Sequence, residues 1–331
     1  MPSLTEKPWF LAVCIPVVIL GIGGGMCYFL LHLLTPPHEP GHHDWSYGEG
    51  SEGPDHWGEI TPGAIASKGI RQSPIDIDSS VAVVSSQLGK GPLGPIKFVY
   101  GGSILSVVNN GHTIQVNCDS TAGNYIEING QKYELLQFHF HAPSEHRIDG
   151  DDYPMELHLV HVLSESSKDK AHAEDKAELK PVQLAVVGVM IKEGKMPNKI
   201  IEELGHANIL TSEPGDDPYN VLVKEFRADD FLPPEGERSY YRYHGSLTTP
   251  PCSENVLWTV MEKPIYFSKT QINIFTSLYK GNRRPIQGAF HRLIMRYSDD
   301  SGSSSATTTP STLPITSASS FIVPVQPSGI Q

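Results

Sequence analysis

The chain has 331 residues, and its 37 acidic side chains outnumber its 25 basic ones to give a net charge of -12. A surface of this sign repels phosphate backbones, so the composition argues against a nucleic-acid partner. Glycine and proline are frequent, with 30 and 27 residues, which favours a protein of strands and loops over a helical bundle.

The N-terminal segment 9–34 is an uncharged apolar run, longer than the roughly 20 residues that cross a bilayer. A cleaved signal peptide has a shorter apolar region and small residues after it, whereas TPPHEPGHHD follows here. We therefore expect a retained signal-anchor helix, with cleavage and secretion as the alternative. Lys7 precedes the run and the next basic residue is Lys68, so the positive-inside rule places residues 1–8 in the cytoplasm and the body outside.

The remaining chain reads as a single domain with two flanking segments. Residues 35–43 form a linker rich in Pro and His, and the Ser/Thr/Pro-rich tail 299–331 is not expected to pack. Between them, 44–298 contains many runs that alternate between apolar and polar residues, which predicts a mainly β (α+β) domain. We expect a surface insertion at 164–180 and a short helix starting near Ser268.

The most informative run is QFHFH at 137–141. A strand sends successive side chains to opposite faces, so Gln137, His139 and His141 share one face and the two intervening phenylalanines share the other. Two imidazoles spaced in this way can converge on one metal ion.

A second strand offers two candidates for a third ligand, His158 and His161, which point to opposite faces. A metal-bound imidazole usually donates its other N–H to a nearby acceptor. Gln137 stands two places before His139, and Glu156 stands two places before His158, so His158 is the favoured ligand. Three histidines leave a fourth position open for water, which is typical of a catalytic zinc site.

A series of motifs occurs in order along the body. They are WSYG at 45–48, RQSPIDI at 71–77, NNGH at 109–112, QFHFHAPSEH at 137–146, ELHLVH at 156–161, GSLTTPP at 245–251 and NRRPIQ at 282–287. Together they resemble the alpha-class carbonic anhydrases over about 44–297. The resemblance implies a large twisted, mostly antiparallel central sheet with short peripheral helices.

The same resemblance implies a zinc lyase that hydrates carbon dioxide reversibly to bicarbonate and a proton. The attacking group would be a zinc-bound hydroxide held by His139, His141 and His158. In the family, the position of Thr248 accepts the proton of this hydroxide and helps to bind the substrate through its backbone N–H. The position of Glu145 orients that threonine.

Two further sets of residues follow from the resemblance. His112 matches the histidine that relays protons between the metal site and solvent, a role suited to a group that titrates near neutral pH. The substrate pocket would be formed by Val160, Val186, Leu247, Thr249, Val256 and Trp258.

The departures from the family pattern concern lineage and cysteines. Ala142 stands where animal cytosolic members carry tryptophan, which makes the chain more similar to bacterial or algal members. Cys118 and Cys252 are the only cysteines of the body, and they either pair in a disulfide or stay free and buried. Relatives often pair the position of Cys252 with a cysteine shortly before QSP, but none lies near Ser67.

Three other functions are compatible with parts of this pattern. A related domain that has lost zinc would serve binding or adhesion, but it would lack a ligand histidine. A zinc hydrolase of esters or peptides is disfavoured because the chain has no HExxH helix. A role in a mineralising matrix would suit the acidic body and the Ser/Thr-rich tail, and could coexist with catalysis.

Overall fold

The computed structural model describes residues 45–84, 96–119, 122–164, 184–205, 208–209, 212–223, 227 and 230–299. The predicted segments 1–8, 9–34 and 35–43 lie outside the described residues. So do the insertion beyond Ser164 and the tail beyond Asp299. Within the described part of the chain, no helix is long and apolar enough to span a membrane.

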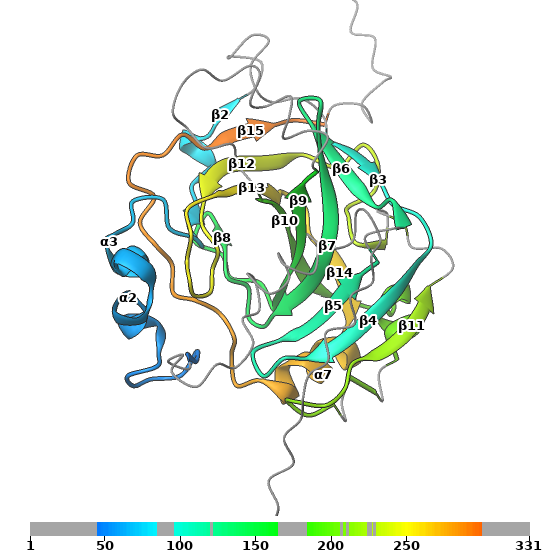
Figure 1. The fold of residues 1–331 in the computed structure, drawn as a ribbon. Coiled ribbons are helices and arrows are strands. Elements are labelled where there is room, and N and C mark those ends of the chain that lie inside the picture. Colours follow the sequence, from blue (N-terminus) through cyan, green and yellow to red (C-terminus); the bar gives the residue numbers. More distant parts are fainter. Residues whose placement is uncertain are drawn as a thin grey trace, which may run out of the picture.

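A 13-stranded sheet dominates the molecule (Figure 1). Its main path runs through β11 (Tyr219–Val223), β4 (Ser103–Asn109), β5 (Ile114–Cys118), β7 (Gln131–His141), β9 (Met155–Leu163), β10 (Leu184–Gly194), β13 (Val256–Met261), β12 (Tyr240–Gly245), β15 (Met295–Tyr297) and β2 (Val83–Val84). β14 (Ile265–Ser268) also pairs with β10, and β6 (Tyr125–Ile128) pairs with both β3 (Lys97–Val99) and β7. A separate ribbon joins β1 (Asp76–Ile77) to β8 (Arg147–Ile148).

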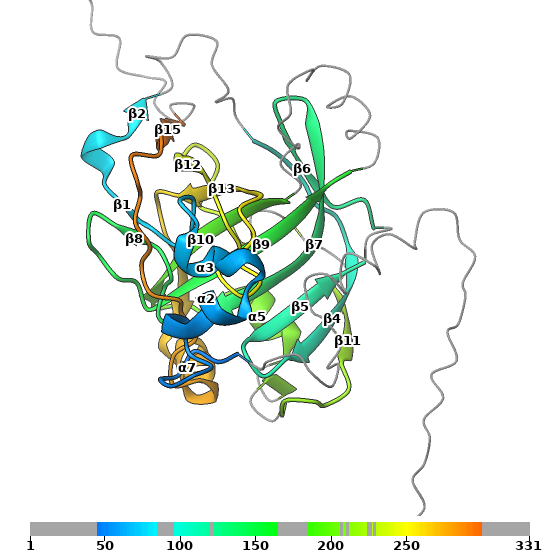
Figure 2. The ribbon, with the colours of Figure 1, turned by 60° about the vertical axis from the view of Figure 1, so that its left-hand side comes forward.

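Most neighbouring strands of the large sheet are antiparallel. The parallel contacts are β10 with β13, β10 with β14, and β15 with β2. The predicted mainly β domain with a mostly antiparallel sheet is therefore confirmed. Figure 2 shows the strong twist of the sheet, which follows from the right-handed twist of each strand.

The helices are short and lie at the periphery (Figure 2). They are α2 (Trp57–Ile60), α3 (Ile65–Lys68), α5 (Lys199–Leu204) and α7 (Lys269–Leu278), with 3-10 turns η1 (Pro54–His56), η2 (Pro62–Ala64) and η3 (Ser79–Val81). α7 begins after Ser268, as predicted. The Ser268 hydroxyl accepts the Gln271 N–H, and the Gln271 side chain accepts the Ser268 N–H, so this capping box fixes the start of the helix.

The sheet has a different apolar cluster on each face. The larger cluster contains Phe138 and Phe140 together with buried residues of α5 and α7, among them Ile200 and Phe275. The smaller cluster contains Val160, Val186 and Trp258. All nine residues of β9 are buried, because both of its faces are covered.

A bulge in β7 sets the register of the central strands. Leu135 lies opposite His161, whereas Gln137 lies opposite Val160, so one extra residue is accommodated between them. Leu136 consequently joins the smaller cluster while Leu135 belongs to the larger one. From Gln137 onward, alternate residues of β7 point to the face of the smaller cluster.

The candidate disulfide between Cys118 and Cys252 is not formed, and both thiols are free. The reason is that they pack in different places. Cys118 lies at the end of β5 against the larger cluster, whereas Cys252 packs with Trp57 and Ala66. Burial raises the pKa of both thiols, to about 11 for Cys252, so both are protonated at neutral pH.

Candidate metal centre

Three histidines meet on the face of the smaller cluster because of the strand register. His139 of β7 lies directly opposite His158 of β9, and His141 lies opposite Glu156. The ring centroids are 5.0 Å apart for His139 and His141, 5.2 Å for His139 and His158, and 4.6 Å for His141 and His158. One nitrogen of each ring lies within 4.8 Å of the other two, which suits a single bound ion.

The two polar residues singled out in the sequence hold two of these rings. His139 Nδ1 lies 2.9 Å from Gln137 Oε1, and His158 Nε2 lies 2.8 Å from Glu156 Oε1. Both oxygens are acceptors, so the ring nitrogens donate. His139 Nε2 and His158 Nδ1 are then left without a proton, as a metal ligand requires.

The third ring is held by a residue to which sequence reasoning gave no role. His141 Nδ1 donates to the backbone oxygen of Asn282 over 2.6 Å, across 141 residues of chain. The opposite nitrogen, His141 Nε2, is buried and has no hydrogen-bond partner. A buried polar atom without a partner costs about 1–3 kcal/mol, and a metal ion at this point would satisfy it. The donor set therefore fits zinc.

The electrostatic environment keeps all three rings neutral. Burial lowers the pKa of His139 well below its usual value, helped by the neighbouring His141 and His158. It lowers the pKa of His141 to about 4 and also depresses the pKa of His158. Because metal ligands must be deprotonated, these rings need not lose a proton when a metal binds at neutral pH.

The carboxylate of Glu156 accepts four hydrogen bonds. Its Oε2 accepts the backbone N–H groups of Glu145 and His146, each over 2.8 Å. Its Oε1 accepts His146 Nδ1 over 2.7 Å and His158 Nε2 over 2.8 Å. Burial acts to raise the pKa of Glu156, but the two histidines outweigh it and hold the pKa well below its usual range. Gly188 makes room, since a Cβ there would lie 2.9 Å from Oε1.

Glu145 and Thr248 lie beside the histidine cluster. Glu145 Oε1 accepts the backbone N–H of Arg284 over 2.8 Å, and its Oε2 lies 3.5 Å from His141 Nε2. Burial raises the pKa of Glu145 to about 7, while interactions with His158, Arg284 and the Thr248 side chain act to lower it. The structure thus brings the predicted pair together next to the histidine cluster.

The predicted pocket residues form a wall next to this cluster. Val160, Val186 and Trp258 lie in register on β9, β10 and β13. With Val256 they are buried in the smaller apolar cluster, and Leu247 packs against it. Thr249 is partly exposed.

His112 stands further out, in a partly exposed position. Its ring is stacked on Trp45 with centroids 3.7 Å apart and planes 10° apart. Tyr47 contacts both His112 and the histidine cluster, with ring centroids 6.4 Å from His112 and 6.5 Å from His141. Burial raises the pKa of Tyr47 well above its usual value, so its hydroxyl stays protonated.

Comparisons with known proteins agree with this geometry. A family model described as eukaryotic-type carbonic anhydrase matches residues 52–296. A carbonic anhydrase from Nostoc sp. is 38% identical, covering 76% of this chain and 85% of the relative. Human carbonic anhydrase 7 is 39% identical, covering 72% and 87%. The structure of an alpha-carbonic anhydrase from Thermovibrio ammonificans, solved with the inhibitor sulfanilamide, aligns with a TM-score of 0.62 at 37% identity, covering 77% and 99%.

This chain belongs to the carbonic anhydrase family. The resemblance inferred from its motifs is confirmed, and the chain is an enzyme of carbon dioxide hydration. The reading as a silent binding domain is not favoured.

Several residues of this carbonic anhydrase site were missed by sequence reasoning. They are Ser73, His146, Tyr243, Asn282 and Arg284, and all are buried. Four of them lie within motifs that the sequence had already singled out, and Tyr243 lies two residues before GSLTTPP. The motifs marked these positions, but only the folded chain shows what their side chains contact.

The rejected ligand candidate, His161, lies on the opposite face of β9. Its Nδ1 donates to the Ala185 backbone oxygen over 3.2 Å, so its Nε2 accepts the Tyr100 hydroxyl over 2.6 Å. It is a fully buried histidine with both nitrogens satisfied.

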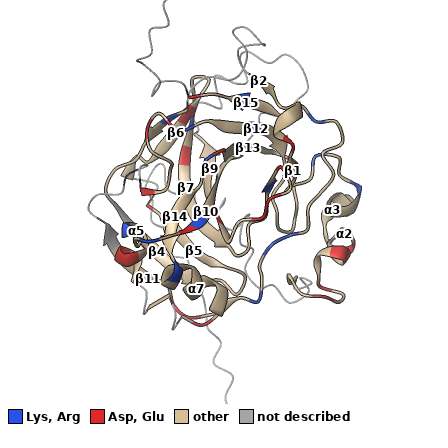
Figure 3. Cartoon of the chain, turned by 180° about the vertical axis from the view of Figure 1, so that it is seen from behind, with Lys and Arg blue, Asp and Glu red and all other residues tan. Residues whose placement is uncertain are grey.

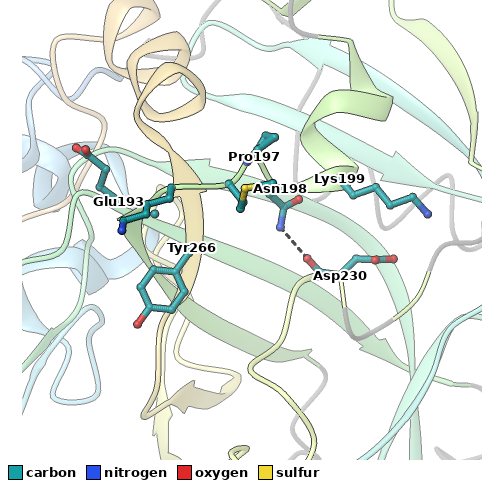
Figure 4. A pocket seen from close by; sticks show the side chains of 9 residues that line it. Glu193, Pro197, Asn198, Lys199, Asp230 and Tyr266 are labelled. Carbon is teal, nitrogen blue, oxygen red and sulfur yellow. Dashed lines mark hydrogen bonds between the residues drawn. The ribbon is translucent and has the colours of Figure 1, made fainter.

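A surface pocket lies away from the histidine cluster, where β10, β14 and the start of α5 meet (Figure 4). Its lining includes Glu193, Lys199, Asp230 and Tyr266, and Asn198 donates to the Asp230 backbone oxygen. Figure 3 shows both signs of charge around α5 and the adjoining end of β10. No predicted site residue lines this pocket.

His161 gives this carbonic anhydrase a pH-dependent stability. Burial lowers its pKa to about 3, whereas an unfolded histidine titrates near 6.5. Between these values only the unfolded chain binds the proton, so this contribution to stability is complete above about pH 6.5 and is lost as the pH falls toward 3.

We therefore expect the wild type to lose up to about 1.4 kcal/mol of unfolding free energy per pH unit below 6.5 relative to His161→Gln. Urea unfolding at several pH values between 7.5 and 4.5 measures this difference. His56→Gln, at the surface beside Glu59, is the control. Parallel pH curves for wild type and His161→Gln would contradict the assignment.

Proposed function

We propose that this carbonic anhydrase acts through one zinc ion held by His139, His141 and His158. The observation that carries the proposal is the convergence of three neutral ring nitrogens, of which His141 Nε2 is buried without a partner. When bound, the ion lowers the pKa of a water ligand to about 7, an effect for which carbonic anhydrase is itself the reference case. Gln137, Glu156 and the Asn282 carbonyl hold the rings.

Thr248 orients the reacting oxygen in this proposal. The Thr248 side chain interacts with Glu145, whose Oε1 is already occupied by the Arg284 N–H. When Glu145 is ionised it only accepts hydrogen bonds, so the Thr248 hydroxyl then donates to it. The threonine oxygen is then free to accept a hydrogen bond from the attacking oxygen, which selects the lone pair that faces the substrate. The Thr248 backbone N–H assists in substrate binding.

The apolar wall accommodates the other reactant. Carbon dioxide carries no charge and is favoured by surfaces such as those of Val160, Val186 and Trp258. Leu247, Thr249 and Val256 complete this pocket. Bicarbonate is charged and is poorly solvated beside such a wall, which favours its release after the reaction.

His112 carries the released proton to solvent. It is partly exposed, and Tyr47 links its position to the ligand His141 through ring contacts. Histidine is suited to this step because its charge changes near neutral pH.

The decisive experiment measures carbon dioxide hydration by stopped flow, with zinc content determined on the same full-length protein. We expect about one zinc per chain and rapid hydration for the wild type. His158→Ala should lose the metal and the activity.

His161→Gln is the matched control, because it lies on the same strand and faces away from the site. It should keep both zinc and activity. A folded, zinc-loaded wild type without hydration activity would overturn the proposal and restore the binding-domain reading.

The proton relay has a separate kinetic signature. His112→Ala should lower the maximal turnover by up to about 100-fold and leave kcat/KM nearly unchanged, because hydration itself does not use His112. Added imidazole buffer should restore turnover by carrying the proton. An unchanged turnover in weak buffer would exclude His112 from this role.

We further propose that segment 9–34 anchors the enzyme, with residues 1–8 in the cytoplasm and the catalytic domain on the extracytoplasmic side. Its length and lack of charge support this reading. The full-length protein should remain with membranes after alkaline carbonate washing.

Ile19→Arg should weaken this retention, because an arginine at the centre of a span is unfavourable by about 2.5–3.5 kcal/mol. Leu313→Arg in the tail is the control. Release of a shortened, soluble chain by the wild type would support the secreted alternative instead.

A further inference from the structure

A chain of buried hydrogen bonds leads from Glu156 into the interior, and it starts at Oε1, the same oxygen that contacts the ligand His158. His146 Nδ1 lies 2.7 Å from Glu156 Oε1, and His146 Nε2 lies 2.7 Å from the Tyr243 hydroxyl. The Tyr243 hydroxyl in turn lies 2.8 Å from Ser73 Oγ. His146, Tyr243 and Ser73 are all fully buried.

The charge of Glu156, together with a neutral His146 ring, gives every proton in this hydrogen-bond chain one direction. An ionised carboxylate only accepts, so His146 donates through Nδ1. In a neutral ring Nε2 is then an acceptor, and the Tyr243 hydroxyl must donate to it. The Tyr243 oxygen can accept in return, so Ser73 donates its hydroxyl proton to Tyr243.

The far end of the chain is attached to the loop that carries Thr248. The Ser73 N–H donates to Ser246 Oγ over 2.9 Å, and the Ser246 N–H donates to Ser73 Oγ over 3.1 Å. The Ser246 hydroxyl donates to the Leu247 backbone oxygen over 2.7 Å. Trp258 Nε1 donates to the Ser246 backbone oxygen over 2.9 Å. The backbone N–H, the backbone oxygen and the hydroxyl of Ser246 are therefore all hydrogen-bonded, two residues before Thr248.

Gly245, next to Ser246, is required by this hydrogen-bond chain. A Cβ at Gly245 would lie 2.2 Å from Ser73 Oγ and 2.7 Å from Tyr243 Cε2. Its φ is not in the left-handed region, so the reason for glycine here is space. Gly188 provides the same clearance for Glu156 at the other end.

We propose that Tyr243 and Ser73 are positioning residues that set both halves of the active site through one directional hydrogen-bond chain. One half is the orientation of His158 through His146 and Glu156. The other half is the placement of Thr248 through Ser246. The inference rests on the proposed zinc site, because His158 is a ligand only there.

The test compares full-length wild type with Tyr243→Phe, Ser73→Ala and the double variant. Tyr241→Phe is the matched control, since it removes a tyrosine hydroxyl from the same strand and the same apolar cluster. Three quantities are measured for each protein: zinc affinity by competition with a chelator, kcat/KM for hydration, and the low-field imidazole N–H proton resonances with and without zinc.

Tyr243→Phe should weaken zinc binding and lower kcat/KM by about tenfold each, the lower end of the range for groups that support a metal ligand. It should also shift the His146 Nδ1–H and His158 Nε2–H resonances. Ser73→Ala should lower kcat/KM more than zinc affinity. The double variant should lose less than the product of the two single losses, because both break one chain.

Wild-type resonances and wild-type zinc affinity in Tyr243→Phe would overturn the inference, as would equal changes in Tyr241→Phe. If Tyr243→Phe does not fold, unchanged resonances in Ser73→Ala overturn it as well. A wild-type protein without zinc would instead contradict the proposed function. The imidazole resonances of the metal-free protein would still test the hydrogen-bond chain.

Discussion

The active site depends on the burial of one ionised carboxylate, that of Glu156. A charge in the protein interior is unfavourable unless it is fully hydrogen-bonded, and here both oxygens accept two hydrogen bonds each. The donors are two backbone N–H groups and two imidazoles. This arrangement fixes the tautomer of His158 and that of His146, and so determines which nitrogen of His158 is free to bind a metal.

The register of the sheet sets the relative positions of the other residues of the site. His139, His158 and Gly188 face one another across β7, β9 and β10, and the next row brings Gln137, Val160 and Val186 together. The proposed ligands His139 and His158 and the apolar wall therefore come from adjacent rows of these strands. Their separation is set by backbone pairing rather than by flexible loops, and a catalytic constellation must be held to within about 0.5 Å.

The sequence predicted those features of the site that follow from the local alternation of residues along a strand or helix. Alternation along a strand placed His139 and His141 on one face, and an acidic residue two places earlier distinguished His158 from His161. The start of α7 at Ser268 followed from the spacing of its apolar residues.

The other parts depend on contacts between distant segments. Nothing near His141 in the sequence indicates that the Asn282 carbonyl orients it, and nothing near Leu135 indicates the bulge that resets the alternation of β7. The sequence could not show whether Cys118 and Cys252 pair, because the distance between them in space depends on the fold and not on their spacing along the chain. Resemblance marked Ser73 and Arg284 as members of motifs without revealing their partners.

The division of the apolar core between the two faces of the sheet has an evolutionary consequence. The larger cluster, with α5 and α7, lies on the face away from the histidines. Most of the apolar burial that stabilises the fold is therefore independent of the metal-binding side chains. A descendant that lost one of these histidines would keep its scaffold and its apolar wall, so a binding protein could arise from this enzyme without passing through an unfolded ancestor.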